Sequence, residues 1–139
     1  MRTTVGVVFL CLLACFAASA DGLPEAQKEQ GVLRPDLAVA TPECSWAPQD
    51  GSWGIPKGCL IEIDYMFVNV PSCMPTTITC ETSGNGVLGK MNLGILMITN
   101  GSGGSPLTMG YLFKAKKKGQ DTITLTVDGV VHQYQITVS

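Results

Sequence analysis

From residue 60 onwards, hydrophobic and polar side chains alternate along the chain, which is the pattern of strands that bury one face. The first such segment, residues 60–70, places its isoleucines on one face and Glu62 and Asp64 on the other. We therefore predict a series of strands in this part of the chain. The same period of two recurs in residues 76–81, 90–99, 107–115, 122–127 and 130–138.

Asp128 and Gly129 lie between the last two of these segments. An Asp-Gly pair between two alternating runs is a strong hairpin signal, because a type I′ turn needs a positive φ at both central residues. We therefore predict that residues 122–127 and 130–138 pair as an antiparallel hairpin.

No segment after residue 20 shows the 3.6-residue period of an amphipathic helix of useful length. An antiparallel sheet that buries one face must pack that face against another layer, and here the second layer has to be another sheet. We therefore expect an all-β fold, an antiparallel immunoglobulin-like β-sandwich, with a small barrel as the alternative.

The first 20 residues have a different pattern, with Arg2, an unbroken apolar run over residues 5–18 and small residues up to Ala20. This pattern predicts a secretory signal peptide over residues 1–20. The apolar run is shorter than the roughly 20 residues that a membrane-spanning helix needs, so we expect no membrane span. The expected location is secreted, extracellular or periplasmic. The alternative is a lipid anchor on Cys15.

The chain has 6 cysteines, and the four that lie outside the predicted signal peptide are Cys44, Cys59, Cys73 and Cys80. An even number of cysteines in an exported chain predicts two disulfides. Three pairings are possible, and we favour Cys44 with Cys59 and Cys73 with Cys80 because short loops close most readily. The alternative, a four-thiolate zinc site, lacks a close Cys-x-x-Cys pair, and we expect no metal.

Residues 21–43 carry five acidic and two basic residues, three prolines and no apolar period, so we expect an acidic leader or linker before a domain over residues 44–139. The net charge of −2 and the 14% of charged residues exclude a basic nucleic-acid binder. Residues 44–59 are dense in turn-forming residues and predict an irregular loop. In that loop, Trp46 and Trp53 either cap the core or lie on the surface.

Few side chains in this chain are candidates for catalysis. His132 is the single histidine, and we expect a structural role for it because no nucleophile and carboxylate are placed to converge on it. Glu62 and Asp64 are roughly 6 to 7 Å apart by strand rise, which overlaps the carboxylate spacing of glycosidases. Alternating acids on the solvent-facing side of a strand are the simpler explanation. We therefore expect no enzyme activity and no cofactor.

Two connections between predicted strands are candidate binding loops, because binding residues concentrate on loops that a rigid scaffold holds. In residues 70–77, two prolines and Cys73 favour an extended shape that loses little entropy on binding. In residues 100–106, the glycines either allow a partner to approach the backbone closely or simply form a flexible connection between two strands. Asn100 is the first residue of an N-glycosylation acceptor motif in this segment. The candidate partner-binding residues are Pro75, Thr76, Thr77, Gly103 and Gly104.

Residues 58–127 carry a family resemblance in the order of their strands and loops. The motif Met74-Pro75-Thr76-Thr77-Ile78 follows the first predicted strand, and the glycine-rich residues 101–104 precede Phe113-Lys114-Ala115 and Gly119. In this order the chain resembles the chagasin family of cysteine-protease inhibitors, whose patterns Asn-Pro-Thr-Thr-Gly and Phe-x-Ala-x-x-x-Gly occupy these places. The resemblance implies an immunoglobulin-like β-sandwich that inhibits papain-like proteases through these loops.

The chain departs from that family at three points. Met74 and Ile78 stand where the family has asparagine and glycine. Asp128 and Gly129 stand where the family has a third inhibitory loop, Arg-Pro-Trp, and the family usually lacks disulfides. The resemblance therefore supports the fold more directly than the activity.

Taken together, these features predict a secreted, non-enzymatic β-sandwich module that binds a protein partner through its loops. The resemblance implies a papain-like cysteine protease as that partner. The alternative is an adhesion or carbohydrate-binding module of a cell surface or matrix, with Trp46 and Trp53 exposed to a surface glycan. We expect no nucleic-acid partner.

Overall fold

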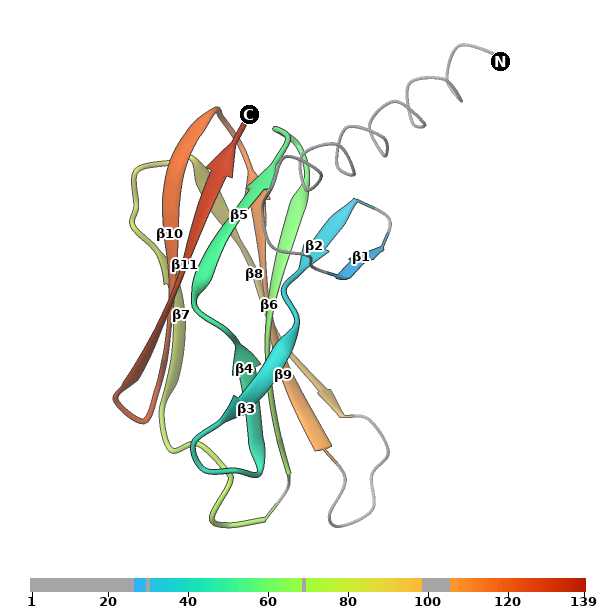
Figure 1. The fold of residues 1–139 in the computed structure, drawn as a ribbon, viewed down its shortest axis with the longest axis vertical. Coiled ribbons are helices and arrows are strands. Elements are labelled where there is room, and N and C mark those ends of the chain that lie inside the picture. Colours follow the sequence, from blue (N-terminus) through green and yellow to red (C-terminus); the bar gives the residue numbers. More distant parts are fainter. Residues whose placement is uncertain (1–26, 30, 69, 99–105) are drawn as a thin grey trace.

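The computed structural model describes residues 27–29, 31–68, 70–98 and 106–139, and every regular element within them is a β-strand. The strands form two sheets that pack across a hydrophobic core (Figure 1). The predicted all-β, disulfide-stapled β-sandwich is therefore confirmed. In chain order the strands are β1 (Gln27–Glu29), β2 (Val32–Arg34), β3 (Leu37–Ala40), β4 (Ser45–Pro48), β5 (Gly51–Ile55), β6 (Leu60–Val68), β7 (Ile78–Thr82), β8 (Leu88–Ile98), β9 (Pro106–Ala115), β10 (Gly119–Val127) and β11 (Val130–Val138).

The larger sheet, sheet A, is built around β6 and contains seven strands among the described residues. Strand β9 runs antiparallel along one side of β6 and pairs in turn with β8. The other side of β6 is shared by β2, which pairs in parallel at its start, and β4, which pairs antiparallel near its end. Strands β1 and β3 extend the sheet from β2 and β4.

The smaller sheet, sheet B, has the order β5-β11-β10-β7 in the described part of the chain. Its strands are antiparallel except β5, which runs parallel to β11. The hairpin predicted between β10 and β11 is confirmed, with φ of 46° at Asp128 and 84° at Gly129. The six strands predicted from alternation are β6 to β11, with ends that differ by up to three residues.

The core lies between the inner faces of the two sheets. The inward positions of β6 are all buried, whereas Glu62 and Asp64 alternate with them on the outer face of sheet A. From sheet B, the Tyr134 side chain is fully buried and its hydroxyl donates a hydrogen bond to the Pro48 carbonyl over 2.9 Å. Side chains with no exposed surface include Ile61, Ile63, Phe113, Ile123, Leu125, Tyr134 and Ile136.

The structure differs from the linker expected over residues 21–43. Within the described part of that segment, β1, β2 and β3 join sheet A, and Leu33 is only 4% exposed in the core. These strands are three or four residues long, which is too short for an alternating pattern to be visible. They are held by backbone pairing instead: β2 pairs with the long strand β6, β1 pairs with β2, and β3 pairs with β4.

The turn-dense segment of residues 44–59 is also more regular than expected, because it forms β4 and β5. Trp53 is 6% exposed and packs against Tyr134, with ring centroids 6.0 Å apart. The alternative in which both tryptophans lie on the surface is therefore wrong for Trp53. Trp46 is half-buried on β4.

The predicted cysteine pairing is wrong, because Cys44 forms a disulfide with Cys73 and Cys80 is a free, buried thiol. Strand β4 pairs with the end of β6, and this register brings Cys44 beside the segment that follows β6. Sheet topology thus overrides the small entropic advantage of a shorter loop. Burial raises the pKa of the Cys80 thiol to about 12.

The Cys44–Cys73 disulfide indicates an extracellular or surface protein, because such bonds persist in oxidising compartments. In the part of the chain that the structure describes, no helix is long and apolar enough to cross a bilayer. The predicted signal peptide lies outside the described residues and stays a prediction.

Candidate functional site

One end of the sandwich gathers three connections that are distant in sequence (Figure 1). These are the turn between β3 and β4, the connection between β6 and β7, and the turn between β10 and β11. We call the described residues 39–44, 70–77 and 128–131 the loop end. The loop predicted to bind a partner, residues 70–77, lies at its centre and is anchored on both sides.

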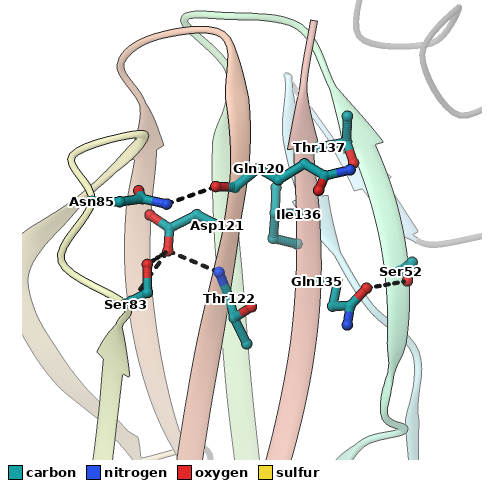
Figure 2. A pocket seen from close by; sticks show the side chains of 9 residues that line it. All are labelled: Ser52, Ser83, Asn85, Gln120, Asp121, Thr122, Gln135, Ile136 and Thr137. Carbon is teal, nitrogen blue, oxygen red and sulfur yellow. Dashed lines mark hydrogen bonds between the residues drawn. The ribbon is translucent and has the colours of Figure 1, made fainter.

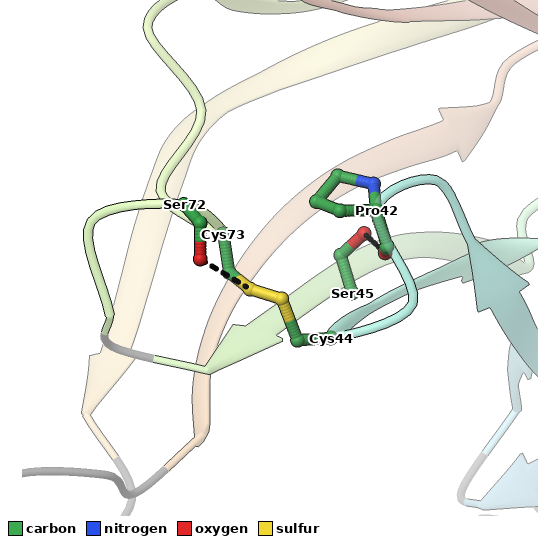
Figure 3. Close-up of a disulfide and its surroundings, with 5 residues drawn as sticks. All are labelled: Pro42, Cys44, Ser45, Ser72 and Cys73. Carbon is green, nitrogen blue, oxygen red and sulfur yellow. Dashed lines mark hydrogen bonds between the residues drawn. A yellow bond between two sulfur atoms is a disulfide. The ribbon is translucent and has the colours of Figure 1, made fainter.

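The first anchor is the disulfide from Cys73 to Cys44, whose Cα atoms are 5.8 Å apart (Figure 3). Backbone hydrogen bonds fold the chain tightly before it: the Cys73 amide donates to the Val70 carbonyl over 2.9 Å and the Met74 amide to the same oxygen over 3.2 Å. On the other side of the disulfide, the buried Ser45 hydroxyl donates to the Pro42 carbonyl over 2.8 Å. The disulfide therefore joins two segments that are each locally fixed.

The second anchor is the carboxylate of Asp128. The Thr76 amide donates to Asp128 Oδ1 over 2.8 Å, and the Thr77 amide donates to the same oxygen over 2.7 Å. In return, the Asp128 amide donates to the Thr77 carbonyl over 2.9 Å. Hydrogen bonds to an ionised carboxylate are stronger than neutral ones. The turn residue of the β10–β11 hairpin thus also fixes the far side of the loop.

Apolar side chains are exposed around this anchored loop. Outside residues 92–98, five large hydrophobic residues are exposed in the described part of the chain; four belong to the loop end and the fifth is Met91. Exposed apolar groups gathered in one region often mark an interaction surface. The four are Val39 at 62%, Met74 at 51%, Val130 at 46% and Val131 at 53% exposure.

The structure places three of the predicted partner-binding residues on this loop. Thr76 and Thr77 are exposed and Pro75 is half-buried. Gly103, Gly104 and the glycosylation acceptor Asn100 lie outside the described residues. Sequence reasoning missed the second role of Asp128, because its position explained it fully as a turn residue.

The carboxylates of Glu62 and Asp64 lie on the outer face of sheet A, away from the loop end. Arg34 Nε donates to Glu62 Oε2 over 3.0 Å, an ion pair that the sequence did not suggest. Asp64 pairs in register with Gly110, where an added Cβ would lie 2.9 Å from Asp64 Oδ1. Glycine at 110 therefore leaves the space that the Asp64 side chain occupies.

The Asp64 carboxyl is partly buried, and this raises its pKa from 3.8 to about 7. Burial is the largest cause, followed by a hydrogen bond and charge repulsion from Glu62, while Arg34 lowers the pKa. Asp64 Oδ1 has no hydrogen-bond donor among the described residues. Two carboxyls can hydrogen-bond to each other only when one of them carries a proton, so the contact with Glu62 adds to the effect of burial on the pKa of Asp64.

His132 lies on β11 with its Nδ1 atom 3.4 Å from Asp50 Oδ1. It lies in the inward phase of β11, as the alternating pattern of the sequence predicted. Among the described residues, no three histidine, cysteine or acidic side chains are arranged to hold a metal ion.

Comparison with known proteins adds two loose structural likenesses. No family model matches the chain, and no curated protein matches it. The crystal structure of domains 4 and 5 of the S-layer protein SbsC is 15% identical with a TM-score of 0.41, over 74% of this chain and 53% of that one. The solution structure of amebosin is 12% identical with a TM-score of 0.37, over 66% of this chain and 90% of that one. At such scores, neither likeness supports a functional argument.

Proposed function

We propose that this chain is an exported, non-enzymatic binding module that contacts a protein partner through its loop end. One observation carries the proposal: residues 73–77 are anchored by a disulfide on one side and by the Asp128 carboxylate on the other, while Thr76 and Thr77 stay exposed. A loop that is ordered before it binds loses less conformational entropy on binding.

The exposed apolar side chains favour a protein as the partner. Met74 lies within the anchored segment, and Val130 and Val131 follow Asp128 directly. Apolar side chains of this size contribute to the water-free centre of protein interfaces. The alternative, a glycan-binding surface with Trp46 and Trp53 exposed, is weakened because the Trp53 side chain is buried in the core.

The resemblance to the chagasin family suggests a papain-like cysteine protease as the partner class. Pro75, Thr76 and Thr77 match the central part of the first inhibitory loop of that family. Where the family has its third inhibitory loop, this chain uses Asp128 to hold the first loop in place. We therefore propose that a single anchored loop enters the protease cleft.

The test is a titration of papain with the secreted protein and with its Thr76→Ala, Thr77→Ala double variant. The parent protein should inhibit papain with a nanomolar constant, and the double variant should inhibit it at least about tenfold more weakly. Its melting temperature should stay close to that of the parent, because both side chains are exposed and the amides that bind Asp128 remain. The replacement removes only a long, exposed hydrogen bond of 3.4 Å from the Thr77 hydroxyl to Asp128 Oδ1.

A matched control makes the same replacement at Thr122 and Thr124, which alternate on the outer face of sheet B before the end of β10 that leads into the loop end. This control should inhibit papain as the parent does. A parent protein that does not inhibit papain would overturn the protease assignment. Equal inhibition by the parent and the Thr76, Thr77 variant would show that the loop is not the contact.

A further inference from the structure

The outer face of sheet B carries a second concave site, at the end of the sheet away from the loop end. A pocket of about 380 Å³ lies over the start of β10, beside the neighbouring part of β11 and the connection from β7 to β8 (Figure 2). Asp128 follows the opposite end of β10, so roughly 20 Å of strand separates the two sites. Binding at one site can therefore be tested independently of the other.

The rim of this pocket is held by Asp121, a carboxylate that is 4% exposed. It accepts hydrogen bonds from the Ser83 hydroxyl at 2.6 Å, the Thr122 amide at 2.8 Å and the Leu88 amide at 3.1 Å. Next to it, Asn85 Nδ2 donates to the Gln120 carbonyl over 2.7 Å. The connection from β7 to β8 is thereby fixed against β10 without any ligand.

The floor of the pocket offers hydrogen-bonding groups that the protein leaves free. Within the described residues, the structure records no hydrogen bond from the side chains of Gln120, Thr122 or Thr137. Gln135 Oε1 accepts only a long hydrogen bond of 3.5 Å from the Ser52 hydroxyl. Both hydrogens of the Gln135 side-chain amide are therefore available to donate to a ligand. Hydroxyl and amide side chains of β10 and β11 thus line one concavity, in which Gln135 is turned toward Ser52 on β5 (Figure 2).

The lining excludes most other ligand classes. Asp121 is the one charged residue among the described lining residues, so the pocket has no positively charged side chain to bind an anion. Both oxygens of Asp121 already accept hydrogen bonds from the protein, so the pocket has no free carboxylate to bind a cation. Ile136 is the one apolar residue among them and has no exposed surface, so an apolar ligand finds little to contact. Neutral groups that both donate and accept hydrogen bonds match the hydroxyls of a sugar.

We propose that this pocket binds a neutral saccharide of one or two rings. Its volume lies near the lower limit of ordinary ligand pockets, which suits a ligand of that size. Because the rim is already fixed by hydrogen bonds within the protein, the site is ordered before the sugar binds. The free side chains of β10 and β11 then supply the hydrogen bonds to the sugar. This site is separate from the loop end and does not depend on the proposed protein partner.

The test is a titration of the secreted, nitrogen-15-labelled protein with maltose, cellobiose, lactose and diacetylchitobiose, followed by NMR. At least one disaccharide should shift the side-chain amide signals of Gln120 and Gln135 in a saturable way. The double variant Thr122→Val, Gln135→Ala removes one cross-strand pair from the floor and should bind that sugar roughly tenfold more weakly.

The sheet supplies a matched control two residues along both strands. Thr124 and Gln133 form the next outward cross-strand pair, and neither of them lines the pocket. The variant Thr124→Val, Gln133→Ala should bind the sugar as the parent does. If no disaccharide shifts these signals, or if both double variants bind equally well, the proposal is overturned. Tighter binding of a sialylated or sulfated sugar than of its neutral parent would overturn the neutral chemistry.

Discussion

Replacing both Cys44 and Cys73 with alanine should lower the free energy of unfolding by about 3 kcal/mol. The two cysteines are 29 residues apart, and a cross-link of that span removes considerable freedom from the unfolded chain. The double variant avoids leaving one unpaired thiol at the loop end. Urea denaturation of the secreted protein and the variant measures the difference.

The neighbouring residue offers a control for local disturbance. Ser72 Oγ lies 3.8 Å from Cys73 Sγ on the exposed surface of the loop, so Ser72→Ala changes the surroundings of the bond without breaking it (Figure 3). We expect that variant to stay within about 0.5 kcal/mol of the parent. A double cysteine variant as stable as Ser72→Ala would contradict the disulfide as a main stabilising element.

Replacing Asp64 with asparagine should stabilise the protein above neutral pH and have little effect in acid. The folded protein holds a proton on Asp64 up to a pKa of about 7, whereas the unfolded chain releases it near 3.8. Folding therefore favours the protonated form, and stability falls as the pH rises between these two values and stays low above them. Asparagine supplies a neutral side chain of similar shape at every pH.

The expected gain at pH 8 is about 1 to 2 kcal/mol, after allowance for solvent screening of a partly exposed carboxyl. Urea denaturation at pH 4 and pH 8 gives the two values for the parent and the variant. Asp36→Asn is the control, since it removes the same charge from an exposed position. A gain that is equal at both pH values, or equal in the control, would contradict the raised pKa of Asp64.

The long strands could be predicted from the sequence because a half-buried strand alternates by necessity. In β10, Ile123, Leu125 and Val127 are buried while the threonines between them are partly exposed, as the pattern required. The short strands β2 and β3 could not be predicted in this way. Three or four residues give too little pattern, and their place in sheet A depends on pairing with β6 and β4.

The candidate site was only partly visible in the sequence. Residues 70–77 could be identified as a rigid loop from two prolines and Cys73, but not the cysteine that anchors it. The partner Cys44 and the carboxylate of Asp128 reach the loop through the register of two different sheets. No local rule on loop length or turn type contains that information.

The pocket on sheet B did leave one signal in the sequence. Asp121 stands in the same phase as Ile123 and Leu125, so an acidic residue occupies an inward position of an alternating strand. A buried carboxylate must find several donors, which it does in Ser83, Leu88 and Thr122. That signal could have predicted a fixed connection between β7 and β8, although not the pocket beside it.

The central claim is that the binding loop is rigid before any partner arrives, and nitrogen-15 relaxation of the free, secreted protein tests it most directly. The amides of Met74, Thr76 and Thr77 report on the anchored segment. We predict backbone order parameters of about 0.85, equal to those of the strands, and a clear decrease at Thr76 and Thr77 in an Asp128→Ala variant. Order parameters below about 0.6 at these amides in the parent protein would contradict the account.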